Sequence, residues 1–351
     1  AIKGSKALLS MNQPHGFDCP GCAWPDPDGE RSATEFCENG AKAVAEEATR
    51  RRIGAAFFAA HSVQDLAEQS DHWLGQQGRL IEPLVLRPGA AHYLPISWDE
   101  AFALLARELH ALASPDEAAF YTSGRTSNEA AFLYQLFARQ FGTNNLPDCS
   151  NMCHESSGTA LKEVVGVGKG TVHLDDFEAC DAVFVVGQNP GSNHPRMLSA
   201  LEAAARRNCA IVSVNPLREP GLVRFSHPQR YESLLARGTP IASLHVPVRI
   251  GGDAAFFRGV SKLLLEADAI DRDFIERHTT GFEAFARNVR ATSWGDIERS
   301  AGVSREAIEA AATIAMRSER TIACWAMGLT QHKDAVATIQ ELVSFMLLRG
   351  K

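Results

Sequence analysis

The stretch VFVVGQNPGSNHP, residues 183–195, contains the pattern that decides the fold. An apolar strand pattern ends at a glycine, a polar loop follows, and Pro195 suits the first turn of a helix. Backbone N–H groups at such a helix start can bind a phosphate. The stretch is neither a GxGxxG nor a Walker sequence, so NAD and ATP are weakly supported. A second strand end, VSVNPLREPG at 212–221, follows one βα unit later, where a nucleotide's ribose is expected. Ordinary loops of an α/β sheet remain the alternative for either stretch.

Strands and helices alternate around this stretch, which predicts an α/β fold with a doubly wound, mostly parallel sheet covered on both faces. Ser97 and Glu100 have capping-box spacing and predict a helix over 97–112. The glycine-rich and polar stretch 148–172 predicts a loop. We expect strands at 118–124, 182–187, 210–216, 243–250 and 321–327, and helices at 127–142, 195–208, 253–268, 304–317 and 334–350.

Composition and charge exclude several classes of function. With 351 residues and 45% apolar content, the chain can bury a large core in two or three subdomains. The net charge of -7, without a dense Lys/Arg run, argues against nucleic acid as a partner. No apolar stretch approaches the roughly 20 residues that span a bilayer, so we expect a soluble, cytoplasmic protein. The chain lacks an initiator Met and a signal-peptide core and stops at the end of a helix, so we expect both ends to be cut.

The cysteines fall into separate groups. Cys19 and Cys22 have Cys-x-x-Cys spacing in a Gly/Pro loop, and Cys37 follows. Such a loop can direct its thiolates at one centre, which favours zinc or an iron–sulfur cluster over a redox disulfide. Local sequence does not separate zinc from iron–sulfur. Three other cysteines lie in buried-strand patterns, where a free thiol acts as a small hydrophobe: Cys180, Cys209 and Cys324.

Several motifs occur together in one order, and in that order they resemble the front part of a molybdopterin oxidoreductase of the dimethyl sulfoxide reductase superfamily. Within that superfamily the resemblance points to the catalytic subunit of formate dehydrogenase. The resemblance runs nearly end to end and implies a formate dehydrogenase/DMSO reductase-like fold with a small N-terminal iron–sulfur region. The motifs are EPLVLRPG (82–89), ISWDEA (96–101), TSGRTSNEA (122–130), FGTNNLPDCSNMCHESSG (141–158), VFVVGQNPGSNHP (183–195), VNPLREPG (214–221) and WAMGLTQH (325–332).

The resemblance also implies a domain division and two catalytic residues. We expect an iron–sulfur region and connector over 1–78, a first α/β domain over 79–150 and a Rossmann-like dinucleotide-binding domain over 151–351. Cys153 occupies the position of the protein ligand to molybdenum or tungsten, a role that suits a soft thiolate. His154 would accept the proton when the substrate C–H bond breaks. A structural thiol and a satisfied loop histidine are the alternatives.

Two molybdopterin guanine dinucleotides (bis-MGD) on one metal are the cofactor that the resemblance implies. Asp253 occupies the position expected to pair with a guanine, and Gly328 and Gln331 resemble a pterin-contacting loop. The residues expected at the strand-end loops are Gly187, Gln188, Asn189, Pro190 and His194 after the first strand, and Asn215, Pro216 and Arg218 after the second.

By the same resemblance, the front cysteines form an iron–sulfur site that departs from the usual pattern. The common third cysteine is replaced by Asp26, which leaves Cys19, Cys22 and Cys37 as thiolate ligands. Three thiolates can hold a three-iron cluster, or a four-iron cluster (4Fe-4S) if Asp26, another side chain or a solvent oxygen supplies the remaining ligand. Lys42 resembles the lysine between cluster and pterin, at a longer spacing from Cys37 than is usual. Asp26 could equally be a loop cap.

The function implied is a two-electron oxidation of a formate-like small molecule, with electrons leaving through the cluster to an acceptor protein or subunit. A nitrate reductase-like enzyme is the alternative within the family. A non-catalytic electron-transfer or scaffold subunit of the same fold is the alternative outside enzymes. The family's substrate-binding arginine is expected beyond Lys351, so we expect residues 1–351 alone to be inactive.

Overall fold

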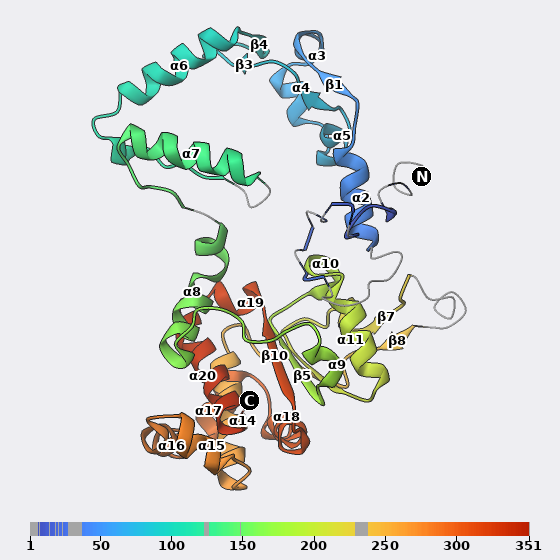
Figure 1. Ribbon diagram of the computed structural model, residues 1–351, viewed down its shortest axis with the longest axis vertical. Helices are drawn as coiled ribbons and strands as arrows, with labels where there is room; N and C mark the ends of the chain where they lie inside the picture. Colours follow the sequence, from blue (N-terminus) through green and yellow to red (C-terminus); the bar gives the residue numbers. More distant parts are fainter. Residues whose placement is uncertain are drawn as a thin grey trace. The chain divides into compact units, whose positions relative to one another are not determined.

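The computed structural model of the chain divides into two compact units (Figure 1). The first comprises Ala1–Met11, His15–Pro20 and Asn39–Cys149, and the second comprises Asn12–Pro14, Gly21–Glu38 and Ser150–Lys351. The border at Cys149 and Ser150 separates them, and the expected boundary after residue 78 stays a prediction. The residues that the structure describes are 6, 8–13, 15–17, 19, 21–22, 24–26, 37–122, 126–147, 149–228 and 238–350.

A four-stranded parallel sheet with the order β10-β5-β6-β9 forms the centre of the second unit. Its strands are β5 (Ala182–Val186), β6 (Ala210–Val214), β9 (Leu244–Val246) and β10 (Thr321–Trp325). The chain proceeds from β5 through β6 to β9 and then returns to the other side of β5 as β10. The strand order therefore reverses between β5 and β10, and such a switch point opens a crevice at the carboxyl ends of the strands.

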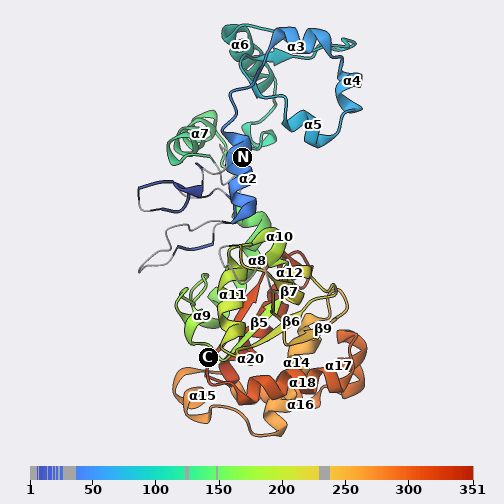
Figure 2. The ribbon, with the colours of Figure 1, turned by 90° about the vertical axis from the view of Figure 1, so that its right-hand side faces the viewer.

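The sheet is buried on both faces because side chains alternate along each strand. Phe184 and Val186 of β5 belong to a core shared with the long C-terminal helices, whereas Val183 and Val185 pack on the opposite side. Helices α9 (Asp176–Ala179) and α11 (Met197–Arg206) cover this second face (Figures 1 and 2). The helices that pack on the first face include α14 (Asp253–Glu266), α18 (Arg305–Arg317) and α20 (Ala335–Leu348).

Further elements complete the second unit and connect the strands. Among them, α8 and α19 are the ones that position candidate site residues. They are α8 (Cys149–Val165), α10 (Pro190–Asn193), α12 (Pro220–Val223), β7 (Arg224–Phe225), β8 (Thr239–Pro240), α15 (Arg272–His278), α16 (Phe282–Ala291), α17 (Trp294–Ala301) and α19 (Met327–Thr330).

The first unit consists of helices and two-residue strand pairs, parallel for β1–β2 and antiparallel for β3–β4. The predicted capping box is present, because Ser97 accepts from the Glu100 N–H and the Glu100 carboxylate accepts from the Ser97 N–H. The elements are α2 (Glu38–Glu47), β1 (Arg52–Ile53), α3 (Ala55–Ala60), α4 (Val63–Ala67), α5 (Asp71–Gly75), β2 (Arg79–Leu80), β3 (Leu84–Val85), β4 (Leu94–Pro95), α6 (Trp98–His110), the short 3₁₀ helix η1 (Pro115–Glu117) and α7 (Asn128–Phe141).

The structure corrects two local predictions. The expected strand at 118–124 is not a strand over its described part, 118–122, because the Phe120 N–H donates to the Asn145 carbonyl and the Phe120 ring packs on α7. The expected loop at 148–172 is wrong for Cys149–Val165, which forms α8 with non-helical dihedrals (φ -134°, ψ 17°) at His154. Within the described ranges, no helix is long and apolar enough to cross a membrane.

Candidate functional site

Four carboxyl strand ends line up along one edge of the sheet. Trp325, Val186, Val214 and Val246 are register partners from strand to strand. The residues that follow them therefore begin neighbouring loops at this edge. These loops contain nearly all of the cofactor-binding residues that the sequence predicts.

Gly187 and Gly328 bring two of these loops close together. The Gly328 N–H donates to the Gly187 carbonyl at 3.0 Å, across the point where the strand order reverses. A Cβ on Gly187, which has φ +56°, would lie 2.9 Å from the Gly328 backbone, and a Cβ on Gly328 would lie 2.4 Å from the Gly187 carbonyl. Only glycine fits both positions, so two bare backbone segments flank the crevice.

Gln188 is the most deeply buried polar side chain of the first loop, at 5% exposure. Its amide N–H groups donate to His194 Nδ1 and Met197 Sδ, both at 3.2 Å. Its Oε1 atom is buried and has no hydrogen-bond partner among the residues that the structure describes. A buried amide oxygen without a donor is costly, so this loop is suited to a ligand that donates a hydrogen bond.

The first and second strand-end loops are held together by asparagines. Asn189 donates to Glu219 Oε2 at 2.6 Å, and Asn215 donates to the Gln188 carbonyl at 3.3 Å. Pro190 begins α10 and is buried. These bonds fix the loop backbones with respect to each other, so two of the predicted contact residues also have a structural role.

Asp253 is a buried carboxylate at the first position of α14, beyond β9. Burial raises its pKa to about 6, and the nearby His332 opposes that shift. The His332 ring nitrogen Nε2 lies 2.7 Å from the Gly328 carbonyl in the loop after β10. A carboxylate in this setting suits a partner with N–H donors.

Neighbouring elements hold the segment of α8 that contains Cys153 and His154. Gln331 donates to the Met152 carbonyl at 2.8 Å, and the Ser156 hydroxyl donates to the Thr330 carbonyl at 3.3 Å. Both bonds come from the end of α19. The predicted pterin-contact residue Gln331 therefore also fixes the chain next to Cys153.

His154, an exposed residue, belongs to a short polar network of the second unit. The Trp325 indole N–H donates to Ser157 Oγ at 2.9 Å, and Ser157 Oγ lies 3.1 Å from His154 Nδ1. Burial lowers the pKa of His194, and the neighbouring His154 lowers it further. Sequence analysis missed Ser157 and Trp325, although both lie in motifs quoted for the resemblance.

His154, Ser157, Gln188, His194 and Trp325 line a cavity of about 490 Å³. Its other walls include the glycine-rich stretch 168–170 and the aromatic side chains of Trp24 and Phe177. Cys153 is not one of the lining residues, and its thiol is partly exposed. The cavity thus brings together predicted residues from α8 and from the loop after β5.

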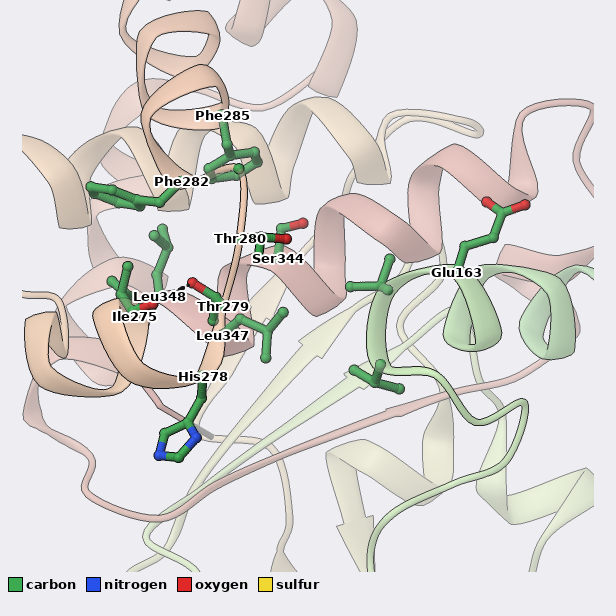
Figure 3. Close-up of a pocket in the computed structure, with 13 residues that line it drawn as sticks. Glu163, Ile275, His278, Thr279, Thr280, Phe282, Phe285, Ser344, Leu347 and Leu348 are labelled. Atoms are coloured by element: carbon green, nitrogen blue, oxygen red, sulfur yellow. Dashed lines mark hydrogen bonds between the residues drawn. The ribbon is translucent and has the colours of Figure 1, made fainter.

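A second cavity of about 500 Å³ lies between α15, α16 and the end of α20 (Figure 3). His278, Thr279 and Thr280 supply polar groups, and Phe282, Phe285 and Leu348 supply apolar ones. None of the predicted site residues lines it. The two cavities have nearly the same volume, but of the two only the first is lined by predicted site residues.

Within the second unit, Arg196 joins the loop after β5 to Trp24 and Asp26 near the front of the chain. Its guanidinium pairs with the Asp26 carboxylate at 2.8 Å and donates to the Trp24 carbonyl at 3.0 Å. Sequence analysis missed Arg196, and nothing in its sequence context indicated this contact. Because Asp26 is paired here, its role as a cluster ligand stays a prediction.

The three front cysteines are partly buried and divide between the units. Cys19 belongs to the first unit, beside Gly40 of α2, and Cys22 and Cys37 belong to the second. In the part of the chain that the structure describes, no group of three or more His, Cys, Asp or Glu side chains could hold a metal ion. The iron–sulfur site and Lys42 therefore stay predictions of the sequence.

Comparison with known protein families agrees with the fold. The molybdopterin oxidoreductase family matches residues 79–351. The chain belongs to the molybdopterin oxidoreductase family. The predicted resemblance and the fold class are thereby confirmed, apart from the iron–sulfur region.

Relatives of this molybdopterin oxidoreductase chain include an uncharacterized oxidoreductase of Mycobacterium tuberculosis, 53% identical over 100% of the chain and 46% of the relative. The protein YdeP of Escherichia coli is 48% identical over 98% of the chain and 47% of the relative. Formate dehydrogenase H of Escherichia coli is 30% identical over 78% of the chain and 36% of the relative. The chain spans about half the length of the M. tuberculosis relative and of YdeP, at 46% and 47%.

A solved structure shares the fold of this molybdopterin oxidoreductase. Acetylene hydratase from Pelobacter acetylenicus has a TM-score of 0.59 at 20% identity, over 75% of the chain and 34% of that structure. At this identity the likeness shows the fold alone.

Proposed function

We propose that the chain is the cofactor-binding part of a cytoplasmic, formate dehydrogenase-like oxidoreductase. The observation that carries the proposal is the cavity at the carboxyl edge, where His154 from α8 meets Gln188 and His194 from the loop after β5. The 30% identity to formate dehydrogenase H supports formate as the substrate class. Two electrons would leave to an acceptor protein or subunit.

The residues present fit a molybdopterin guanine dinucleotide. The glycine crossing at Gly187 and Gly328 leaves backbone exposed to a flat ligand, and Gln188 Oε1 needs a hydrogen-bond donor. Asp253 presents a buried carboxylate that can accept from the N–H groups of a guanine. The loop residues Asn189, Pro190, His194, Asn215, Pro216, Arg218 and Gln331 would complete the cradle.

The bound metal centre would supply the two-electron chemistry, and an iron–sulfur cluster at Cys19, Cys22 and Cys37 would conduct electrons onward. The Cys153 thiolate would ligate molybdenum or tungsten, because a thiolate is a soft and strongly donating ligand. His154 would accept the proton released by the substrate. The Trp325–Ser157 pair would orient the His154 ring at Nδ1, as outer partners orient functional imidazoles.

Turnover by the full-length protein tests the proposal. We expect reduction of an oxidised viologen dye by formate, and a His154→Gln variant with kcat lowered about 100-fold. His278→Gln, in the second cavity, is the matched control and should leave turnover unchanged. Oxidation of reduced viologen by nitrate, without formate activity, would contradict the proposal. Elemental analysis that finds neither molybdenum nor tungsten would favour the non-catalytic alternative.

A further inference from the structure

Two buried thiols lie in contact at the amino end of the sheet, opposite the edge with the candidate site. Cys180 follows α9 directly and lies two residues before β5, and Cys209 directly precedes β6. Their Sγ atoms are 3.6 Å apart. Sequence analysis treated each as a separate core residue, and the structure brings them together.

A cation lies beside this pair. The Phe177 carbonyl accepts from Cys180 Sγ at 3.4 Å and also from Arg207 Nη2 at 2.6 Å. The guanidinium is thus held next to the Cys180 sulfur by a shared acceptor. A neighbouring cation favours the thiolate, which is the reactive form of cysteine.

Hydrogen bonding acts in the same direction. The bond from Cys209 lowers the pKa of Cys180 and Arg207 lowers it further, against burial and the charge of Asp181. Cys324 in β10, which packs against the same core, differs because burial raises its pKa to about 12. Cys180 is therefore an activated thiol in contact with Cys209, and Cys324 is a less acidic thiol for comparison.

We propose that Cys180 and Cys209 form a reversible disulfide when the protein meets a peroxide. The Cys180 thiolate attacks one peroxide oxygen, which breaks the O–O bond and gives a sulfenic acid and one water. Cys209 then attacks that sulfur, loses its proton and displaces the second water. Two thiols are oxidised and one hydrogen peroxide is reduced to two waters.

The local backbone suits this bond. The Ala210 N–H donates to the Asp181 carbonyl at 2.9 Å, so the chain segments next to both cysteines are already side by side. The sulfur atoms need to approach by about 1.5 Å from their 3.6 Å separation to reach disulfide length. The bond would close the segment 180–209, which contains the Gly187–His194 loop.

Peptide mapping by mass spectrometry of the native, full-length protein after brief peroxide treatment tests the proposal. We expect a cross-linked peptide pair with Cys180 and Cys209, formed about tenfold faster than Cys324 is oxidised. Dithiothreitol should reverse it. Oxidised protein should unfold at a melting temperature roughly 5 °C higher, because the closed loop restricts the unfolded chain.

Matched variants sharpen the result. Cys180→Ser and Cys209→Ser should each abolish the cross-link and the thermal shift, whereas Cys324→Ser should keep both. Circular dichroism checks that each variant folds. The peptide mapping of the wild-type protein tests the proposal even if a variant fails to fold. Absence of the cross-link in native protein, or its formation only after unfolding in urea, would overturn the proposal.

Discussion

Helices α6 and α14 have nearly equal length and both have apolar side chains, but only one of them is buried. In α6, Trp98, Phe102 and Leu105 are each about 60% exposed (62%, 59% and 58%). In α14, Phe257 and Val260 are fully buried, because α16, α17, α18, α20 and the sheet pack around them.

The difference shows that local sequence specifies a helix, whereas tertiary packing decides whether the helix is buried. A capping box and amphipathic spacing are local, so they specify α6 without any tertiary partner. Burial requires a complementary surface, and the sheet of the second unit supplies one for α14. Stability should therefore be concentrated in the second unit, and the following changes test that inference.

The largest effect is expected from truncating an aromatic side chain of α14. Phe257 lies 5.6 Å from Phe345 and 6.3 Å from Phe184, measured between ring centroids. Phe257→Ala should lower the free energy of unfolding by about 3–5 kcal/mol through lost burial and a cavity. Phe102→Ala in α6 should change it by less than about 0.5 kcal/mol. Urea denaturation followed by circular dichroism measures both, and equal losses would contradict the comparison.

Carboxylates of the two helices should respond to pH in opposite directions. Burial raises the pKa of Asp253 from 3.8 to about 6, so between these values the folded state binds more protons than the unfolded state. Stability should therefore fall as pH rises through this window, by about 3 kcal/mol in the cofactor-free protein. Asp253→Asn should remove the fall.

Glu100 of α6 is the matched carboxylate for that experiment. Hydrogen bonds from Ser97 lower its pKa, so its contribution is present above its ordinary pKa of 4.5 and is lost as pH falls. Glu100→Gln should weaken stability at neutral pH and leave it unchanged in acid. Urea titrations between pH 3 and pH 7 measure the free energy of unfolding of each variant. If this free energy rises from pH 4 to 6 in the wild type in parallel with Asp253→Asn, the raised pKa of Asp253 is excluded.

The glycine crossing should tolerate substitution less than an open glycine. Gly187 and Gly251 both have positive φ, at +56° and +80°, but a Cβ on Gly251 would meet no atom within 4 Å. Both alanine variants incur the left-handed backbone penalty of about 1–2 kcal/mol. Gly187→Ala should lower the free energy of unfolding by about 2 kcal/mol more than Gly251→Ala does, because its Cβ collides with the Gly328 backbone. Equal stability of the two variants in guanidinium would argue against the close approach.

The smallest effect is expected in the polar network of His154. Trp325→Phe and Ser157→Ala should each lower the free energy of unfolding by about 1 kcal/mol. Because the two side chains share one hydrogen bond, the double mutant should show a coupling energy of similar size. In the full-length enzyme each should lower kcat roughly tenfold with little change in KM. Ser157→Thr retains the hydroxyl and should restore most turnover. Strictly additive single mutants would show that the two side chains act independently.

Much of the second unit could be predicted because its signals are local. The apolar run at 182–187 became β5, and the strands expected at 210–216 and 321–327 became β6 and β10. The carboxyl ends of parallel strands share an edge, so Gly187 and Asn215 could be placed at one edge before the register was known. Gly328 was placed near them by the resemblance.

Other features could not be predicted because they depend on contacts between distant residues. Helix α8 has weak helix formers and little apolar periodicity, and bonds from Gln331, Ser156 and Trp325 connect it to the end of β10 and to α19. The pairing of Arg196 with Asp26 and the contact of Cys180 with Cys209 each join segments whose separation in sequence carries no local signal.

Local spacing and side-chain chemistry were enough to predict the α/β alternation, the caps of individual helices and the residue types at the carboxyl edge of the sheet. The order of the motifs along the chain was enough to predict the family. The tertiary structure decided which apolar face is buried, which carboxylate has a raised pKa, and which thiols and imidazoles meet. Burial and partnership are set by the surfaces that fold against a residue, and those surfaces come from elsewhere in the chain.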